Sequence, residues 1–219
     1  MSKIYNVVIA DDHPLIVDAI KTMIKKSTVM NIIATAINGK DTLDIIKRLN
    51  NIEEFNNIVD VLIFDINMPE LNGIDLSEII YKEYPKIKMI AVTMRTDIYT
   101  VKMLIDNKVR AIVDKSSELE DLNIAIEEVL KGYKYYSKNI EKLIQNNEEM
   151  LSLISKIKIT KREKEVLYHL SIGNTSPVIS KLLNTSIPTI NSHRQNLIAK
   201  FEVNNVAELI RKATEHNYI

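Results

Sequence analysis

Two adjacent aspartates near the start of the chain and a third one further on could do chemistry together. Asp11 and Asp12 follow the apolar run that ends at Ala10, and Asp65 ends the run VLIFD. Carboxylates brought close to one another either take up protons or hold a cation. A small set of oxygen ligands suits Mg²⁺, which keeps several waters and binds through one or two carboxylates. The sequence therefore predicts a magnesium site, if the fold brings the three aspartates together.

Thr93 and Lys115 stand at the ends of two further apolar runs, as the three aspartates do at the ends of theirs. They add a hydroxyl and a cation to the predicted site. In such a set Asp65 can attack phosphorus, Lys115 can neutralise the phosphoryl oxygens and Thr93 can donate a hydrogen bond to one of them. Each residue alone has an ordinary explanation as a cap, a packed hydroxyl or a solvated lysine. Their shared placement is what indicates phosphoryl transfer to a carboxylate.

The elements that must position these residues alternate over residues 1–131. Short runs rich in Val and Ile predict strands at 5–10, 31–36, 59–64, 88–92 and 110–113. Amphipathic patterns between and after them predict helices at 14–26, 40–50, 73–84, 97–107 and 118–131. Alternation of this kind predicts an α/β fold, a doubly wound five-stranded parallel sheet with helices on both faces. The ligand site of such a sheet lies at the carboxyl ends of its strands, where the five residues stand.

Helical patterns alone follow residue 131. Residues 132–157 predict an amphipathic linker helix, with a partner-binding helix as the alternative. Residues 158–219 predict a small all-α domain with helices at 160–171, 175–183, 187–200 and 204–216. Thr160 and Glu163 have the spacing of a capping box. Three parts are thus expected, at 1–131, 132–157 and 158–219.

The charge distribution and the residue types of the chain limit the kinds of partner and site that it can have. The formal net charge is zero, but residues 156–219 hold 10 Lys and Arg against 5 Asp and Glu, which favours a nucleic acid as partner of this end. The absence of cysteine excludes disulfides and thiolate metal sites. A charged-then-apolar leader is missing, and no stretch reaches the roughly 18 to 20 apolar residues that span a bilayer. We therefore expect a cytoplasmic protein without a membrane partner.

The segments IADDHP, VLIFDINMPELNGIDL, AVTM and VDKSS resemble the receiver domain of bacterial two-component response regulators, over residues 4–131. The resemblance implies a flavodoxin-like fold and a sensor histidine kinase that phosphorylates Asp65. It also implies that Asn67 lends a backbone carbonyl to Mg²⁺ beside Asp11 and Asp12.

Two departures bear on this resemblance. Many relatives carry an aromatic residue where this chain has Ile112, so coupling of Thr93 to a rotating ring is not expected at this position. Hydrolases of the haloacid dehalogenase type also form an aspartyl phosphate, but they need a second aspartate at the position of Asn67. An amide cannot act as their general acid or base, so we do not expect an enzyme.

The segment ITKREKEVLYHLSIGNTSPVISKLLNTSIPTINSHRQNLIAKF resembles the DNA-binding domain of the NarL/FixJ or LuxR type, over residues 159–213. Ser186 can cap the second helix of its helix-turn-helix, and the helical period turns Ile187, Ile190, Leu197, Ile198 and Phe201 inward. By position, the outward side of this helix presents side chains to base edges and phosphates. The expected contacts are Thr189, Asn191, Ser192, Arg194, Gln195 and Lys200. Relatives usually carry lysine where Pro177 and Asn191 stand. The absence of these two cations from this chain lowers its nonspecific electrostatic attraction to DNA.

Together these features predict a DNA-binding transcription regulator controlled by phosphorylation. We expect it to bind promoter DNA as a homodimer, at least when it is phosphorylated or DNA-bound. Three alternatives stay open: a regulator that works without phosphorylation and uses its receiver for dimerisation, a signalling adaptor or phosphatase, and a helical tail that binds no DNA.

Overall fold

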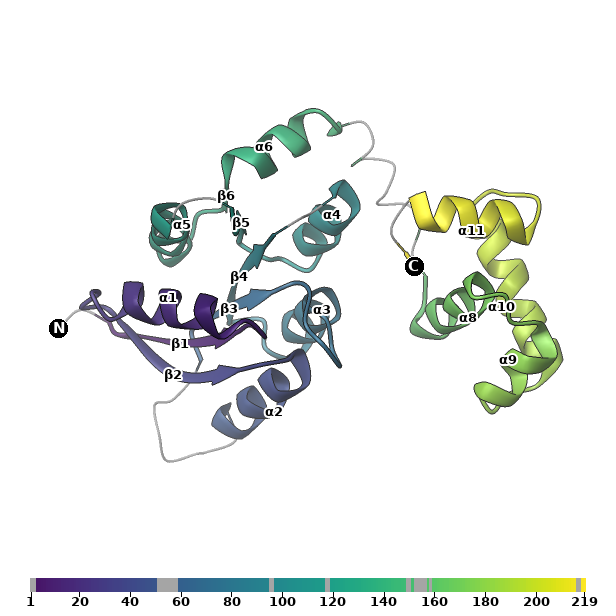
Figure 1. The fold of residues 1–219 in the computed structure, drawn as a ribbon, viewed down its shortest axis with the longest axis horizontal. Helices are drawn as coiled ribbons and strands as arrows, with labels where there is room; N and C mark the ends of the chain where they lie inside the picture. Colours follow the sequence, from purple (N-terminus) through teal and green to yellow (C-terminus); the bar gives the residue numbers. More distant parts are fainter. Residues whose placement is uncertain are drawn as a thin grey trace. The chain divides into compact units, whose positions relative to one another are not determined.

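The computed structural model describes residues 3–50, 59–94, 97–116, 119–148, 151, 157, 159–215 and 218–219. The chain divides into two compact units, Met1–Glu148 and Glu149–Ile219 (Figure 1).

The first unit is built on a parallel sheet with the strand order β2-β1-β3-β4-β5-β6. The strands are β1 (Tyr5–Ala10), β2 (Met30–Ala36), β3 (Val61–Asp65), β4 (Lys88–Thr93), β5 (Ala111–Asp114) and β6 (Tyr135–Tyr136). The doubly wound sheet is confirmed, but the expected number of five strands is wrong by one. The additional β6 has two residues, which is too short for a periodic pattern, and it forms because Tyr135 and Tyr136 pair with Ala111 and Ile112.

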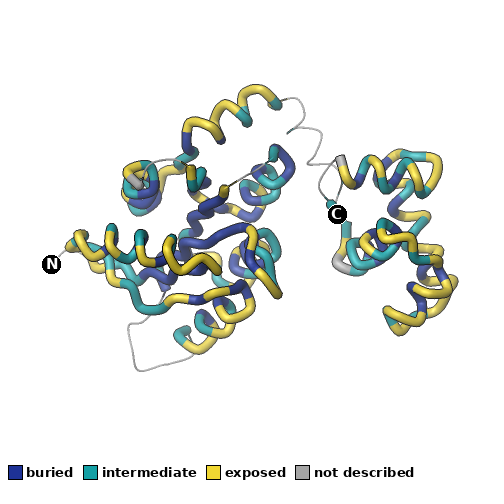
Figure 2. Tube along the Cα trace, viewed as in Figure 1, coloured by how far each residue is buried: buried dark blue, intermediate teal, exposed yellow. Residues whose placement is uncertain are grey.

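Helices cover both faces of this sheet, as Figure 1 shows. They are α1 (Pro14–Ile24), α2 (Gly39–Asn50), α3 (Gly73–Glu83), α4 (Ile98–Asp106) and α5 (Leu119–Lys131). Successive strand side chains point to opposite faces, so Val7 and Ile9 pack with α1 and α5, whereas Val8 and Ala10 pack with α2, α3 and α4. The buried residues therefore concentrate in the central strands (Figure 2).

A further helix, α6 (Lys138–Gln145), packs on the first unit. Ile140 is buried in the core on the side of α3 and α4, and Leu143 and Ile144 pack against the same core. Of the two interpretations of the linker segment, this packing supports a helix held on one domain. The domain boundaries expected from the sequence remain predictions, and most of residues 149–157 lie outside the described residues.

The second unit is all helical. It contains α8 (Lys161–Ser171), α9 (Ser176–Leu182), α10 (Ile187–Lys200) and α11 (Val206–Glu215) around one apolar core. The capping box of Thr160 and Glu163 is confirmed, since each side chain bonds the backbone N–H of the other. Along the described chain, every helix is too short or too polar to cross a lipid bilayer.

Candidate functional site

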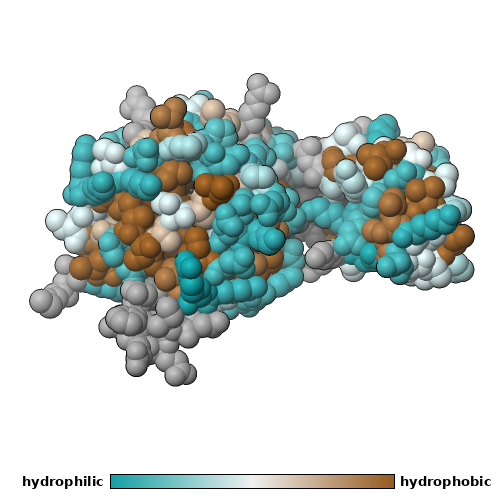
Figure 3. All heavy atoms as spheres, turned by 60° about the horizontal axis from the view of Figure 1, so that its bottom comes forward, coloured by the Kyte–Doolittle hydropathy of each residue, from teal (hydrophilic) through white to brown (hydrophobic). Residues whose placement is uncertain are grey.

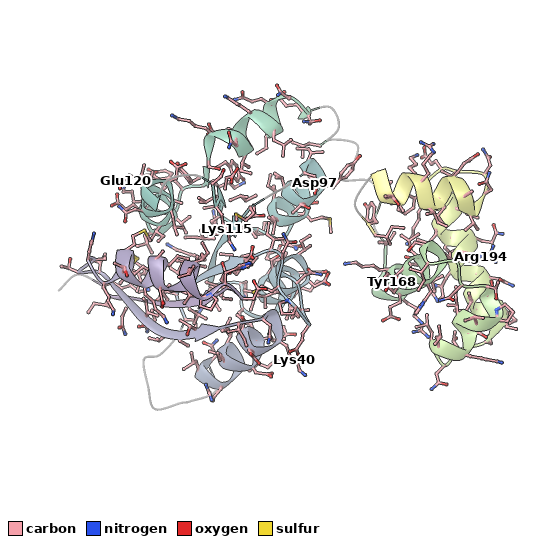
Figure 4. All side chains as sticks on the ribbon, viewed as in Figure 1. Lys40, Asp97, Lys115, Glu120, Tyr168 and Arg194 are labelled. Atoms are coloured by element: carbon pink, nitrogen blue, oxygen red, sulfur yellow. The ribbon has the colours of Figure 1, made fainter. Side chains whose placement is uncertain are left out.

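The carboxyl ends of β1, β3 and β5 bring Asp11, Asp65 and Lys115 together. The Lys115 Nζ lies 2.7 Å from Asp11 Oδ2 and 2.9 Å from Asp65 Oδ2. All three side chains are at least 96% buried. Figure 4 marks Lys115 among the side chains of the first unit. The ammonium group offsets part of the repulsion between two buried carboxylates, which otherwise have to take up protons or bind a cation.

The loop between β3 and α3 holds Asp65 in place through Gly73. The Gly73 N–H donates to the carbonyl of Ile66 at 2.8 Å, which closes the loop beneath the aspartate. A Cβ atom at Gly73 would lie 2.4 Å from the carbonyl oxygen of Asp65 and 2.7 Å from Ile66 Cα. Both are backbone atoms, so glycine is required for this close approach.

Thr93 and Asn67 lie where the topology predicts. Thr93 ends β4 and is buried, and its carbonyl accepts the backbone N–H of Lys115 at 2.6 Å. This bond links the ends of β4 and β5 directly beside the buried lysine. Asn67 is exposed in the loop two residues after Asp65. The five residues of the expected phosphoryl site thus belong to one edge of the sheet.

The oxygens that Lys115 does not contact are suited to a cation. Asp65 Oδ1 is buried and has no hydrogen-bond partner among the described residues. One ligand atom from each of Asp11, Asp12, His13 and Asp65 can be chosen so that all lie within 4.8 Å of one another. Oxygen-rich sets of this size fit a hard divalent cation such as Mg²⁺.

Sequence reasoning missed His13. Its Nδ1 lies 2.8 Å from Asp12 Oδ1 and 3.1 Å from Asp11 Oδ1. The position immediately after two site aspartates was the available signal. However, a sequence pattern does not predict which way the side chain of a single histidine points. Only the structure shows that the imidazole of His13 is turned toward the carboxylates.

The end of β5 is tied to the start of α6 next to the site. Asp114 accepts hydrogen bonds from Ser116 and from Asn139 Nδ2, and its own N–H donates to Ser137 Oγ at 3.1 Å. Burial alone raises the pKa of Asp114, but the hydrogen bonds from Ser116 and Asn139 outweigh it and hold the pKa below its ordinary value. The residue next to Lys115 is therefore a stable anion that holds α6.

Ile112 lies two residues before Asp114 on β5 and is fully buried. Its carbonyl accepts the N–H of Ser137 at 3.1 Å, and its register partner on β6 is Tyr136. The Tyr136 side chain packs against the core on the side of α3 and α4. This burial raises the pKa of its hydroxyl. An aromatic ring is thus present beside Ile112, on the neighbouring strand.

On the second unit, α10 presents a polar face. Thr189, Asn191, Ser192 and Gln195 are exposed, whereas Ile190 and Leu197 are buried in the core. Ser186 begins the helix by accepting the N–H of Thr189, as expected from the sequence. Ile187 was expected on the inward side, but it is 42% exposed. The orientation of the helix still leaves most of the expected base-contacting residues accessible.

The two cations expected on α10 have intramolecular partners. Arg194, labelled in Figure 4, donates from its guanidinium group to Ser176 Oγ at 2.7 Å. Lys200 Nζ lies 2.6 Å from Glu163 Oε2. Burial alone raises the pKa of Glu163, but hydrogen bonds from Lys200 and Thr160 outweigh it and lower the pKa. Both cations therefore help to hold α10 on its neighbours.

Both halves of the chain match known protein families. Residues 7–127 match the response regulator receiver domain, and residues 158–213 match the luxR family of bacterial regulatory proteins. The first match covers more than half of the chain and contains the whole acidic site. The second match contains α8, α9 and α10 completely.

Curated proteins resemble the chain over most of its length. The transcriptional regulatory protein MctR of Rhizobium johnstonii is 26% identical over 97% of this chain and 94% of its own length. The nitrate/nitrite response regulator protein NarP of Escherichia coli is 27% identical over 91% of this chain and 89% of its own.

Solved structures agree with these matches. A complex of the response regulator RcsB with DNA is 27% identical, covers 97% of this chain and 98% of that chain, and has a TM-score of 0.59. RcsB from Salmonella enterica serovar Typhimurium, bound to a promoter with the phosphomimetic BeF₃⁻, is 26% identical, covers 95% and 97% of the two chains, and has a TM-score of 0.61. The chain belongs to the response regulator family, as a DNA-binding transcription regulator with an N-terminal receiver domain and a C-terminal LuxR-type domain.

Proposed function

We propose that Asp65 is the phospho-acceptor through which phosphorylation controls DNA binding by α10. The observation that carries this proposal is the buried set of Asp11, Asp65 and Lys115, in which Asp65 Oδ1 has no partner among the described residues. A buried polar atom without a partner is costly, and a reactive or ion-binding role accounts for its presence.

The proposed reaction transfers a phosphoryl group from a phosphohistidine of a sensor kinase. An oxygen of Asp65 forms a bond to phosphorus while the bond from phosphorus to the histidine nitrogen breaks, and the imidazole leaves with that electron pair. Lys115 then neutralises a phosphoryl oxygen, and the Thr93 hydroxyl donates to another. Thr93 ends β4, which pairs with β3, and Lys115 directly follows β5, which pairs with β4. The sheet therefore positions both groups before the reaction begins.

A divalent cation completes the site in this proposal. Asp11, Asp12 and Asp65 are its proposed carboxylate ligands, and Asn67 offers a backbone carbonyl. When bound, Mg²⁺ neutralises charge that develops on the transferred group. The fit rests on the oxygens that point away from Lys115, since these are the atoms left to bind a second positive charge.

Apolar side chains beside this edge are suited to a partner kinase. Leu15 follows β1 in the first turn of α1 and is 84% exposed, and Met94 directly follows Thr93 and is also exposed. Hydrophobic residues reach the surface of both units elsewhere as well (Figure 3). An exposed leucine next to a phospho-acceptor provides an apolar contact for the protein that delivers the phosphoryl group.

The proposed DNA contacts are Thr189, Asn191, Ser192, Arg194, Gln195 and Lys200. Asn191 and Gln195 are exposed amides one turn apart on α10, and amides can pair with adenine edges in the major groove. Arg194 and Lys200 must exchange or share their present partners to contact phosphates. We place this activity in the cytoplasm, on promoter DNA, with a homodimer as the binding species and without catalytic turnover.

The phosphorylation step is tested by intact-protein mass after incubation with Mg²⁺ and a small phosphodonor such as acetyl phosphate. We expect one added phosphoryl group in the wild type and none in Asp65→Asn. Asp18→Asn is the matched control, because Asp18 is an exposed aspartate on α1 and its loss leaves the acidic site intact. Equal phosphoryl gain in Asp65→Asn and the wild type contradicts the assignment of Asp65.

The control of DNA binding is tested in parallel on a sizing column and with a random-sequence duplex library. We expect the phosphorylated wild type to shift toward a dimer and to retain more duplex than the unphosphorylated protein. Equal duplex retention in both states, with Asn191→Ala still reducing it, favours the alternative in which the regulator acts without phosphorylation.

A further inference from the structure

The side chain of His13 is oriented toward the acidic site although its position in the fold does not require this. His13 is the N-cap residue of α1, yet its side chain makes no capping hydrogen bond. The imidazole Nδ1 instead lies within 3.1 Å of oxygens of both Asp11 and Asp12. The backbone N–H of His13 also donates to Asp11 Oδ1 at 2.9 Å, which holds the residue over this carboxylate.

The same oxygens are the ones that Lys115 leaves unoccupied. Lys115 contacts the Oδ2 atoms of Asp11 and Asp65, whereas His13 faces Asp11 Oδ1. Asp65 Oδ1 completes this side of the site as a buried atom without a partner in the described chain. Lys115 and the His13 imidazole therefore contact different oxygens of the Asp11 carboxylate. A cation bound by the oxygens that Lys115 does not contact meets the His13 nitrogen as well.

The spacing allows one ion to bind all four residues. Ligand atoms about 2.1 Å from a common ion are at most about 4.2 Å apart. The candidate ligand atoms of Asp11, Asp12, His13 and Asp65 lie within 4.8 Å of one another. The difference is small enough for side-chain rotation to close the set, because His13 is 61% exposed and Asp12 is 34% exposed.

We infer that His13 is a nitrogen ligand of the cation site and makes it accept imidazole-binding divalent ions, of which Co²⁺ is the probe. The Nδ1 proton that faces Asp11 and Asp12 leaves to solvent when the ion takes its place. This inference rests on the proposed cation site at Asp65. Mg²⁺ is bound by oxygen ligands and gains little from imidazole, whereas affinity for nitrogen-containing sites rises from Mn²⁺ through Co²⁺ to Ni²⁺. His13 thus sets which ions compete with Mg²⁺ at this site.

The test measures ion binding to the full chain by calorimetric titration with Co²⁺ and, separately, with Mg²⁺. His13→Gln is expected to weaken Co²⁺ binding roughly tenfold or more and to change Mg²⁺ binding less than about threefold. His169→Gln is the matched control, since it removes a histidine of α8 in the second unit and is expected to change neither affinity. Equal Co²⁺ affinity in His13→Gln and the wild type overturns the inference.

A spectroscopic measurement detects the ligand directly. Pulsed electron paramagnetic resonance of the Mn²⁺-loaded wild type is expected to show coupling to a histidine nitrogen that ¹⁵N-histidine labelling alters and His13→Gln removes. Absence of this coupling in Mn²⁺-loaded wild type also overturns the inference. If Asp65→Asn leaves binding of both Mg²⁺ and Co²⁺ unchanged, the cation site of the proposed function fails as well. If only the His13→Gln effects are missing, the proposed function stands without this ligand.

Discussion

The ion pair between Glu163 and Lys200 joins α8 to α10 and offers a quantitative test of how the DNA-binding unit is held together. The Glu163 side chain is 4% exposed, and its Oε2 accepts both the N–H of Thr160 at 2.7 Å and the Lys200 ammonium at 2.6 Å. Lys200→Met keeps most of the aliphatic stem but leaves a buried carboxylate without its cation.

A hydrogen bond to a charged group contributes about 1.5 to 3 kcal/mol, more than a neutral one. Lys200 is 35% exposed, so water replaces part of its contribution and a value near the lower half of this range applies. For about 2 kcal/mol, a domain of roughly 70 residues loses about 8 to 16 °C in Tm. We therefore expect a loss of this size for Lys200→Met in the transition of the second unit.

The assay is differential scanning calorimetry of the full chain, with Lys181→Met as the matched control on an exposed lysine of α9. The Glu163→Gln and Lys200→Met double variant should recover part of the loss, because it no longer contains an unpaired buried carboxylate. The pKa of folded Glu163 is lowered, so its contribution is present above the ordinary value of 4.5 and lost as the pH falls through the lower folded value. The difference between the wild type and Lys200→Met should therefore narrow toward pH 3.

A Tm for Lys200→Met within about 2 °C of that of Lys181→Met would show that the pair contributes no net stability. A loss that is the same at pH 7 and pH 3 would instead show that packing of the lysine stem, rather than charge, is responsible.

Three further changes test the receiver unit. Gly73→Ala places a Cβ against the backbone of Asp65, so we expect about 1 to 3 kcal/mol lower stability in urea unfolding and slower phosphoryl gain; unchanged values for both refute the close-packing argument. Ile140→Ala removes a buried side chain where α6 packs on the core and should cost about 2 to 4 kcal/mol in the same assay, whereas a loss below about 0.5 kcal/mol indicates that α6 is not held there. Asp114→Ala should cost about 1 kcal/mol at pH 7. Because its folded pKa is lowered, this cost should disappear as the pH falls below about 3.8, and a cost that persists at pH 2 contradicts its assignment to the charged form.

Much of the secondary structure was predictable because its signals are local. The strand runs of Val and Ile, the Thr160 and Glu163 capping box, and the Ser186 cap are visible as patterns of neighbouring residues, and the structure confirms them. β6 was missed because two residues cannot display a period and their pairing partner lies in β5. The exposure of Ile187 was missed because helical periodicity assigns it to a face but not to a packing partner.

The sequence by itself determined the doubly wound architecture and the set of carboxylates, hydroxyl and amine at its strand ends, since hydrophobic period and residue type are properties of the chain alone. The tertiary structure decided which atoms meet. It pairs Lys115 with one oxygen each of Asp11 and Asp65, and it turns His13 toward the remaining oxygens. It also engages Lys200 with Glu163, 37 residues away. These contacts depend on side-chain rotation and on strands and helices meeting across long separations, and no local pattern encodes such distances.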